Sequence, residues 1–403
     1  MSGSRRLRGL LVVAGLAVLA VLAALAAIQE GVRAPGVWCT RDGDPFRAST
    51  RVDPHVTAVI PTDSFEVCEL DEPCVAADAA GVWLLRRRER ELVRVDPRTN
   101  IVVARIGLGR GLDASWAPQS LAIGDGAVWV FTSRLPPAHP PPDGSRPSRP
   151  GRYLPVVVQR VDPATNAVAN LRLPTRRLAG PLPAGLAQTG GTQAAAAAGG
   201  AVWLIGFGDQ VVRLDEASGA IKAIAVGAQV RDLAAVDGGV WLATDAGLVR
   251  LNLSGNATTG RPITPGPDQR YTGLAATSDG LWAMVTRQLR EGPMVVPTTL
   301  DRVVRLDPAS GRVLASVPVA HGSTELVGLR GGDGLLAVAL TQAHTCGFAT
   351  EWQYDVSVVD ARSGHVRVRA GIDDNVADVA VGAGAVWIAE PSTGRLLRVD
   401  PSS

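Results

Sequence analysis

The sequence predicts an all-β protein: a seven-bladed β-propeller of four-stranded blades, preceded by a single N-terminal transmembrane helix. Two repeated phrases and one apolar run predict this architecture. A glycine-anchored phrase such as GAVWVF (126–131) begins at residues 81, 126, 200, 239, 280, 334 and 384. A second phrase, such as QRVDPATN (159–166), recurs between the copies of the first. The shortest spacings of the first phrase, 39 and 41 residues, match the period of propeller blades.

Each repeat unit reads as four short strands. In the second unit these are SLAIGDG, AVWVF, VVVQRVD and AVANLRL, with PATN as the turn before the last. β-branched and aromatic residues favour pleated strands, whereas Asp, Pro and Asn favour tight turns. The repeated aspartates are therefore predicted to form turns, and the repeated tryptophans to fill the gaps between blades. The copy at 334 reads GLLAVAL, with Leu in place of Trp. The tryptophans are Trp83, Trp129, Trp203, Trp241, Trp282 and Trp387.

The two ends of the repeat region complement each other. The last unit stops after LLRVDPSS and lacks a fourth strand. Near the start, STRVDPHVTAVIP carries the turn phrase followed by a spare strand, 56–60. We expect this strand to complete the last blade, which would remove an open sheet edge and close the propeller over 49–403.

The N-terminus predicts a membrane anchor. Arg5, Arg6 and Arg8 precede an uncharged apolar run over 9–28. A helix of about 20 residues crosses the roughly 30 Å hydrocarbon core of a bilayer. The arginines favour a cytoplasmic tail (1–8), so the linker (29–48) and the propeller are predicted on the extracytoplasmic side. The competing interpretation is a cleaved signal peptide ending at ALA (24–26), in which case the protein is secreted.

Four cysteines follow the apolar run: Cys39, Cys68, Cys74 and Cys346. An even number suits two disulfides in an oxidising compartment. Cys68 with Cys74 is the first pairing to expect from their proximity in the sequence, which leaves Cys39 with Cys346. A metal site is the alternative, although no C-x-x-C spacing accompanies these residues.

Long insertions fall on one predicted rim of the ring. Segments 132–153, 286–300 and 341–353 join second to third strands, while 61–74 and 174–193 enter first strands. Both kinds of connection lie at the same end of the blades. Loops on a rigid scaffold commonly carry function, so this rim is the predicted binding surface. Its candidate binding residues are Arg134, Arg152, Leu289, Trp352, Asp373 and Asp374.

One grouping of histidines and carboxylates could act as a base or hold a divalent metal. His321 and Glu325 enter a first strand, and His344 leaves the second strand of the same unit. Apart from that metal, no cofactor is predicted. The formal net charge of +2 gives no reason to expect nucleic acid, and we expect a monomer.

The pattern GAVWVx…VxRVDPxTxxVxxxIxxG resembles bacterial extracytoplasmic propellers of the YVTN and NHL types and the virginiamycin B lyase-like group. The resemblance covers nearly everything from residue 49 onward. The lyase-like group often reads W-F-T-E at the second strand and draws a metal site from a carboxylate and histidines. Here WIAE (387–390) comes close, so the resemblance implies Glu390 as a candidate ligand.

Two functions follow as expectations. The leading one is non-catalytic: binding or scaffolding of an envelope ligand or protein partner through the rim that carries the insertions. The alternative, implied by the lyase-like resemblance, is a metal-dependent lyase or hydrolase acting on a small molecule.

Overall fold

The computed structural model describes residues 53–63, 73–113, 116–134, 156–172, 195–205, 209–236, 238–254, 262–287, 290–291, 294–295, 299–307, 310–318, 323–346, 349–372 and 375–402. The predicted tail (1–8), membrane segment (9–28) and linker (29–48) lie outside these residues. Among the described residues, no helix is long and apolar enough to cross a membrane. The chain divides into a large unit, Thr50–Gln342 with Gln353–Ser403, and a small one, Met1–Ser49 with Ala343–Trp352.

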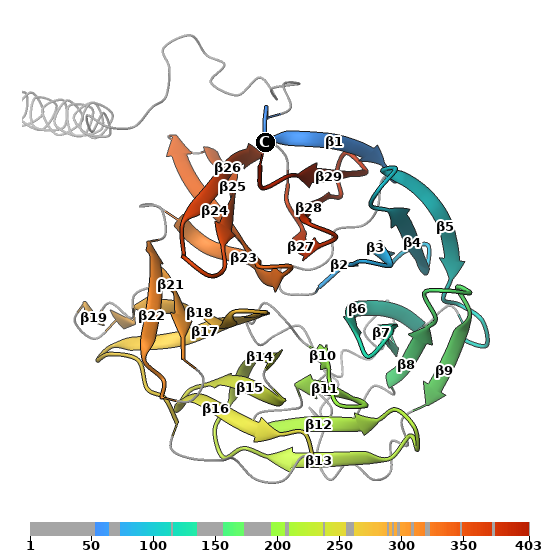
Figure 1. Cartoon of the computed structure of the whole chain (residues 1–403), viewed down its shortest axis with the longest axis horizontal. Helices are drawn as coiled ribbons and strands as arrows, with labels where there is room; N and C mark the ends of the chain where they lie inside the picture. Colours follow the sequence, from blue (N-terminus) through green and yellow to red (C-terminus); the bar gives the residue numbers. More distant parts are fainter. Residues whose placement is uncertain are drawn as a thin grey trace, which may run out of the picture. The chain divides into compact units, whose positions relative to one another are not determined.

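The large unit is a ring of seven antiparallel sheets, which confirms the predicted all-β, seven-bladed propeller (Figure 1). The first strand of each blade lies innermost and contacts the first strands of both neighbouring blades, including that of blade 7 with that of blade 1. Blade 1 contains β2 (Val75–Asp78), β3 (Gly81–Arg86), β4 (Glu91–Asp96) and β5 (Ile101–Gly107). Blade 2 contains β6 (Trp116–Gly124), β7 (Ala127–Arg134), β8 (Val156–Val161) and β9 (Val168–Arg172). Blade 3 contains β10 (Ala195–Ala197), β11 (Ala201–Ile205), β12 (Gln210–Asp215) and β13 (Ile221–Ala225).

Three of the remaining blades, 4, 5 and 7, depart from a simple four-strand meander. Blade 4 has three described strands, β14 (Val230–Val236), β15 (Gly239–Thr244) and β16 (Gly247–Asn252), and the fourth position holds a single bridge between Leu248 and Ile263. Blade 5 contains β17 (Gln269–Thr277), β18 (Gly280–Arg287), β21 (Thr299–Leu306) and β22 (Val313–Pro318), with a hairpin of β19 (Arg290–Glu291) and β20 (Met294–Val295) inserted between its second and third strands. Blade 6 contains β23 (Ser323–Gly332), β24 (Leu335–Cys346), β25 (Ala349–Asp360) and β26 (Val366–Ile372). Blade 7 contains β27 (Asp378–Gly382), β28 (Ala385–Glu390), β29 (Arg395–Val399) and, as its outer strand, β1 (Val56–Pro61).

Blade 7 is built from both ends of the described chain. β1 pairs antiparallel with β29, so that Val59 lies opposite Leu397 and Ile60 opposite Leu396. The Thr62 hydroxyl donates to the carbonyl of Gly394 at 3.0 Å. The Asp53 carboxylate accepts a hydrogen bond from the backbone N–H of Gly371 in blade 6 at 3.0 Å. The sheet edge that the last repeat leaves open is thus covered by the strand that the sequence provides ahead of the first repeat.

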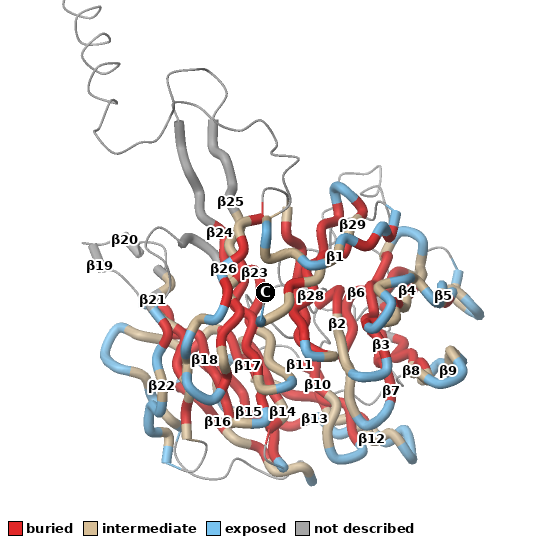
Figure 2. The backbone as a smooth tube through the Cα atoms, turned by 45° about the horizontal axis from the view of Figure 1, so that its top comes forward, coloured by how far each residue is buried: buried red, intermediate tan, exposed pale blue. Residues whose placement is uncertain are grey.

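Buried residues run along the strands of the ring (Figure 2). The repeated tryptophans are buried and pack between adjacent blades. Trp129 packs with apolar side chains of blade 3, and Trp203 with those of blade 4. In each of six blades the Trp stands opposite an Ala of the innermost strand, as Trp282 stands opposite Ala275. Several indoles also donate to a carbonyl at the end of their own first strand, such as Trp387 Nε1 to Gly382 O at 3.0 Å.

The strand register of blade 6 corrects the residue that the sequence analysis assigned to the tryptophan position. Its strand register places Ala337 opposite Arg330, where the other blades place Trp opposite Ala. Ala337, not a Leu, therefore occupies the tryptophan position in the copy that begins at Gly334. The junction between blades 6 and 7 is filled by aliphatic side chains, including Val358, Val379 and Ile388.

A third-strand arginine connects each of several blades to the next one. Its guanidinium lies over the Trp of its own blade, at 5.1 Å from the ring centroid for Arg94 and Trp83. The same side chain donates to a backbone carbonyl in the following blade: Arg94 to Pro163 O at 2.6 Å, and Arg398 to Pro97 O at 2.8 Å. We call this arrangement of Trp, Arg and neighbouring carbonyl the inter-blade clamp.

The contribution of β1 to stability can be tested with two neighbouring residues. Ile60 is buried against the core, whereas the side chain of Val59 on the same strand is 41% exposed. We expect Ile60→Ala to lower the free energy of unfolding by about 2–5 kcal/mol. Val59→Ala should change it by no more than about 0.5 kcal/mol. Denaturant unfolding followed by tryptophan fluorescence measures both, and equal effects would contradict the closure by β1.

Candidate functional site

The ring has two chemically different rims. Connections between first and second strands and between third and fourth strands form one, which we call the turn rim. Here the repeated aspartates accept hydrogen bonds within their own turns, as Asp162 does from the backbone N–H of Ala164 at 2.7 Å. The backbone N–H of Ser363 and the guanidinium of Arg367 hold the pKa of Asp360 below its usual range. These carboxylates are structural acceptors, as the turn phrase predicts.

The opposite rim, which we call the loop-bearing rim, carries the long connections. Twenty-one residues join β7 to β8, and 22 residues join β9 to β10. The sequence places its candidate binding residues here. Arg134 ends β7 and Trp352 lies near the start of β25, although their side chains are not among those described. Arg152, Leu289, Asp373 and Asp374 lie outside the described residues, so the binding role of all six stays a prediction.

The structure describes the backbone of two of the three residues in the predicted histidine and carboxylate group. Glu325 lies in β23 opposite Thr341 of β24, and His344 lies three residues further along β24. The two residues therefore belong to neighbouring strands of blade 6, with side chains outside the description, and His321 is outside it altogether. Among the described residues, no cluster of three His, Cys, Asp or Glu side chains is arranged to hold a metal. The metal site stays a prediction.

Glu390, the ligand implied by resemblance, takes part in an ion pair. It ends β28 and is 2% exposed. Its Oε2 accepts from Arg395 Nε at 2.8 Å and from the Thr393 hydroxyl at 3.2 Å, across the hairpin to β29. Blade 1 has a comparable pair across its own hairpin, with the charges exchanged: Arg86 Nη1 lies 2.8 Å from Glu91 Oε2. The contacts of Oε2 indicate that Glu390 helps to hold its hairpin.

The cysteine predictions fall mostly outside the description. Cys74 is buried immediately before β2. Cys39 and Cys68 lie outside the described residues, and the side chain of Cys346, the last residue of β24, is not described. The pairings Cys68 with Cys74 and Cys39 with Cys346 remain predictions.

The innermost strands hold an ion pair that the sequence analysis missed. Arg330 of β23 donates from Nη2 to Asp378 Oδ1 of β27 at 2.9 Å. The other carboxylate oxygen accepts from the backbone N–H groups of Cys74 and Val75, at 2.9 and 3.2 Å. Asp378 thus joins the inner strands of blades 6, 7 and 1. Burial raises its pKa, and the Arg330 guanidinium offsets part of that rise.

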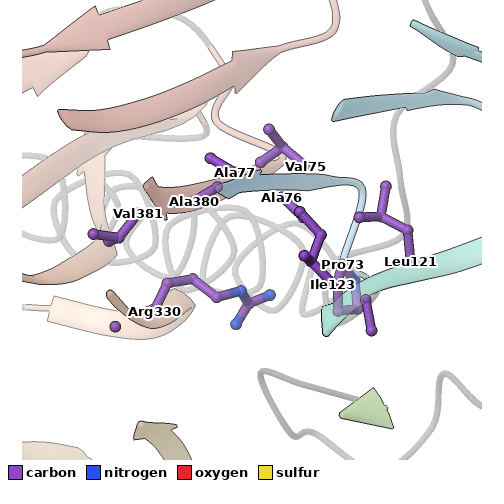
Figure 3. Close-up of a pocket in the computed structure, with 11 residues that line it drawn as sticks. Pro73, Val75, Ala76, Ala77, Leu121, Ile123, Arg330, Ala380 and Val381 are labelled. Atoms are coloured by element: carbon purple, nitrogen blue, oxygen red, sulfur yellow. The ribbon is translucent and has the colours of Figure 1, made fainter. Parts of the chain in front are cut away.

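A cavity of about 130 Å³ lies beside Arg330 (Figure 3). Its walls come from β2, β6, β23 and β27, the first strands of blades 1, 2, 6 and 7. The Arg330 side chain extends across it from β23 toward Ile123 and Pro73 (Figure 3). The one signal that could have revealed this site is the replacement of the usual inner-strand Ala by Arg in blade 6.

Asp232 is the counterpart of Asp378 in blade 4. It is fully buried, and its Oδ2 accepts from the backbone N–H of Leu274 in blade 5 at 2.7 Å. Each of the two aspartates stands two residues before the inner-strand Ala that faces the Trp of its blade. An inner-strand carboxylate that joins adjacent blades is therefore a structural device used at two junctions of the described ring.

Comparison with known proteins identifies the fold and no narrower group. No protein-family model matches the chain, and no curated protein sequence matches it. A chain in the crystal structure of a mitotic checkpoint complex has a TM-score of 0.53 at 10% identity, over 86% of this chain and 94% of that chain. BamB from Moraxella catarrhalis has a TM-score of 0.46 at 13% identity, over 85% and 99%. The β-propeller domain of Cps50 (Swd1) from Myceliophteria thermophila has a TM-score of 0.49 at 12% identity, over 85% and 98%. At these identities the likeness shows a propeller fold alone, so the YVTN, NHL or lyase-like type stays a prediction.

The Arg330–Asp378 pair predicts a measurable coupling. Asp378→Ala would leave a buried guanidinium and two buried N–H groups without their acceptor, so we expect it to lower the free energy of unfolding by about 3–5 kcal/mol. Arg330→Ala leaves the carboxylate its two backbone donors, and we expect a smaller loss of about 1–3 kcal/mol. The double variant should lose less than the sum, by about 0.5–3 kcal/mol.

The control is a second double-mutant cycle in which Asp232, the counterpart of Asp378, takes the place of Asp378. Asp232 lies in blade 4 and accepts from Leu274 in blade 5, so Asp232→Ala and Arg330→Ala should be additive within about 0.5 kcal/mol. Denaturant unfolding of the single and double variants measures both cycles. Additivity of Asp378→Ala with Arg330→Ala would show that the 2.9 Å contact contributes nothing to stability.

Proposed function

We propose that this chain is a membrane-anchored extracytoplasmic propeller that serves as a binding or scaffold module, with a protein of the cell envelope as its partner. The observation that carries the proposal is the difference between the two rims. Most described aspartates of the repeated turn phrase accept hydrogen bonds within their own turns, and the inter-blade clamps use carbonyls on the same rim. Most long connections belong to the loop-bearing rim.

The distribution of the long connections supports a protein partner. They enter blades 1 and 3 and interrupt blades 2 and 5, so they come from well-separated parts of the ring. A surface that draws on several blades suits an extended interface better than a single small molecule, because specific protein interfaces use about 20–30 residues a side. The rigid ring fixes the spacing of these loops, which lowers the entropy lost on binding.

The membrane anchor is part of the proposal and rests on the sequence. Residues 9–28 are apolar and uncharged, and the arginines before them favour a cytoplasmic tail. The alternative function is a metal-dependent lyase or hydrolase that uses His321, His344 and Glu325. Elemental analysis of the purified full chain and of its His344→Ala variant tests it, since that function requires a stoichiometric divalent metal lost from the variant.

The rim assignment predicts the result of two matched loop replacements. We expect replacement of 137–150 and of 288–298 by short Gly-Ser linkers to reduce crosslinking to an envelope protein partner by about tenfold or more, because hot-spot contacts dominate binding. Photo-crosslinking of the full chain in cells of its native host measures this. The control replaces 255–261, the long connection on the turn rim between β16 and Ile263, and should leave crosslinking unchanged.

All variants must retain the thermal unfolding midpoint of the parent chain within a few degrees for the comparison to hold. Unchanged crosslinking in both loop-bearing-rim variants would overturn the proposal. Loss in the 255–261 variant alone would move the binding surface to the turn rim.

A further inference from the structure

Blade 6 exchanges the residues of a repeated pair. The other six blades set an inner-strand Ala opposite a second-strand Trp; blade 6 sets Arg330 opposite Ala337. Directly opposite residues of an antiparallel pair project to the same face of the sheet. The small Ala337 thus leaves room beside the inner strand for the long side chain of Arg330.

The clamp arginine of blade 6 is also missing. The third and fourth strands of blade 1 have a register irregularity between Arg94 and Val95, and those of blade 6 have one between Val358 and Val359. Val358 therefore stands at the position of the clamp arginine. Other blades keep this positive charge at the blade junction, whereas blade 6 carries one on its inner strand, as Arg330, in the lining of the cavity.

The guanidinium of Arg330 is held in place. Nη2 donates to Asp378 at 2.9 Å and Nη1 to the carbonyl of Leu329 at 3.2 Å. The Arg330 side chain is 12% exposed and that of Asp378 2%. These contacts use two of the five N–H donors of a guanidinium. Asp378 itself already accepts from two backbone N–H groups, so its negative charge is shared among three donors.

The cavity next to Arg330 has the size of a small organic molecule. Its volume is about 130 Å³, and an apolar cavity of about 150 Å³ accommodates benzene. Ala76, Ala77 and Ile123 are the half-buried apolar residues of its lining, whereas Val75 and Leu121 are 2% exposed and pack in the core between the blades. Figure 3 shows the lining residues around Arg330. Arg330 is the single charged residue among the described residues that line it.

We propose that the cavity beside Arg330 binds a short aliphatic carboxylate of about six non-hydrogen atoms, its carboxylate on Arg330 and its alkyl group against Ile123, Ala76 and Ala77. A guanidinium matches the geometry of a carboxylate and can bond both oxygens. Phosphate carries more charge and requires several donors, whereas this cavity offers a single cation among its described lining residues. The site is separate from the proposed rim surface and does not depend on it.

The probe for the test is isobutyrate, titrated into the full chain in detergent micelles by isothermal calorimetry. We expect saturable binding with one site per chain. Arg330→Met should weaken it about tenfold or more, because a hydrogen-bonded charge contact is lost. Isobutanol, which has the same alkyl group without the charge, should bind the parent chain about tenfold more weakly or not at all.

A matched control removes a different paired arginine. Arg231 forms an ion pair with Asp245 at 2.7 Å in blade 4, away from the residues that line the cavity. Arg231→Met should leave isobutyrate binding unchanged. Intermolecular NOEs from isobutyrate methyl groups to the methyl groups of Ile123 and Val381 should locate the ligand in the parent chain.

A second variant tests the same contact if Arg330→Met does not fold. The double substitution Arg330→Ala with Ala337→Trp gives blade 6 the residue pair of the other six blades, and we expect it to fold and to lose isobutyrate binding. The proposal is overturned by no saturable binding to the parent chain, by equal binding of isobutanol, or by inorganic phosphate binding in preference to isobutyrate. It is equally overturned if either Arg330 variant binds isobutyrate as the parent does, or if the NOEs to Ile123 and Val381 are absent.

Discussion

The closure of the ring in blade 7 is the constraint on which the rest of the structure depends. Each blade packs on two neighbours, so an open ring would expose two apolar blade faces and a sheet edge. β1 covers the edge of β29. Asp53 binds blade 6, while Arg398 and Asp378 bind blade 1. Closure is therefore shared between a β-ladder at the outer strand, a buried carboxylate on the inner strand and a clamp at the turn rim.

The same closure explains why blade 6 differs from the others. A clamp arginine donates to the following blade, as Arg94 does to Pro163 and Arg398 to Pro97. In blade 7 the third and fourth strands come from opposite ends of the chain, so no hairpin joins them. A clamp arginine in blade 6 would lack such a hairpin carbonyl, and a buried Val358 stands there instead. With Trp also replaced by Ala337, the inner strand can carry Arg330, which joins Asp378.

Sequence reasoning recovered what the repeat determines locally and missed what depends on distant partners. The strand period, the turn aspartates and the buried tryptophans follow from patterns within one unit. The pairing of strand 56–60 with the last blade could be inferred, because the last repeat lacks a strand and a spare strand precedes the first repeat. The hydrogen bond from the backbone N–H of Cys74 to Asp378 joins residues 304 positions apart, so no local sequence pattern predicts it. Arg330 was detectable only as a departure from the repeat. Likewise the WIAE match pointed to Glu390 as a ligand, whereas Arg395 and Thr393 occupy its Oε2.

Hydrogen exchange of the full chain, followed by mass spectrometry of the peptide covering Val56–Pro61, tests the closure most directly. β1 is the outer strand of blade 7, so those of its amides that bond to β29 exchange only when the blade opens, and they should be protected to the same degree as the paired amides of β28 and β29. Exchange of this peptide at the rate of an unstructured chain, with β27 to β29 still protected, would contradict the account. It would mean that the ring holds together without its N-terminal strand.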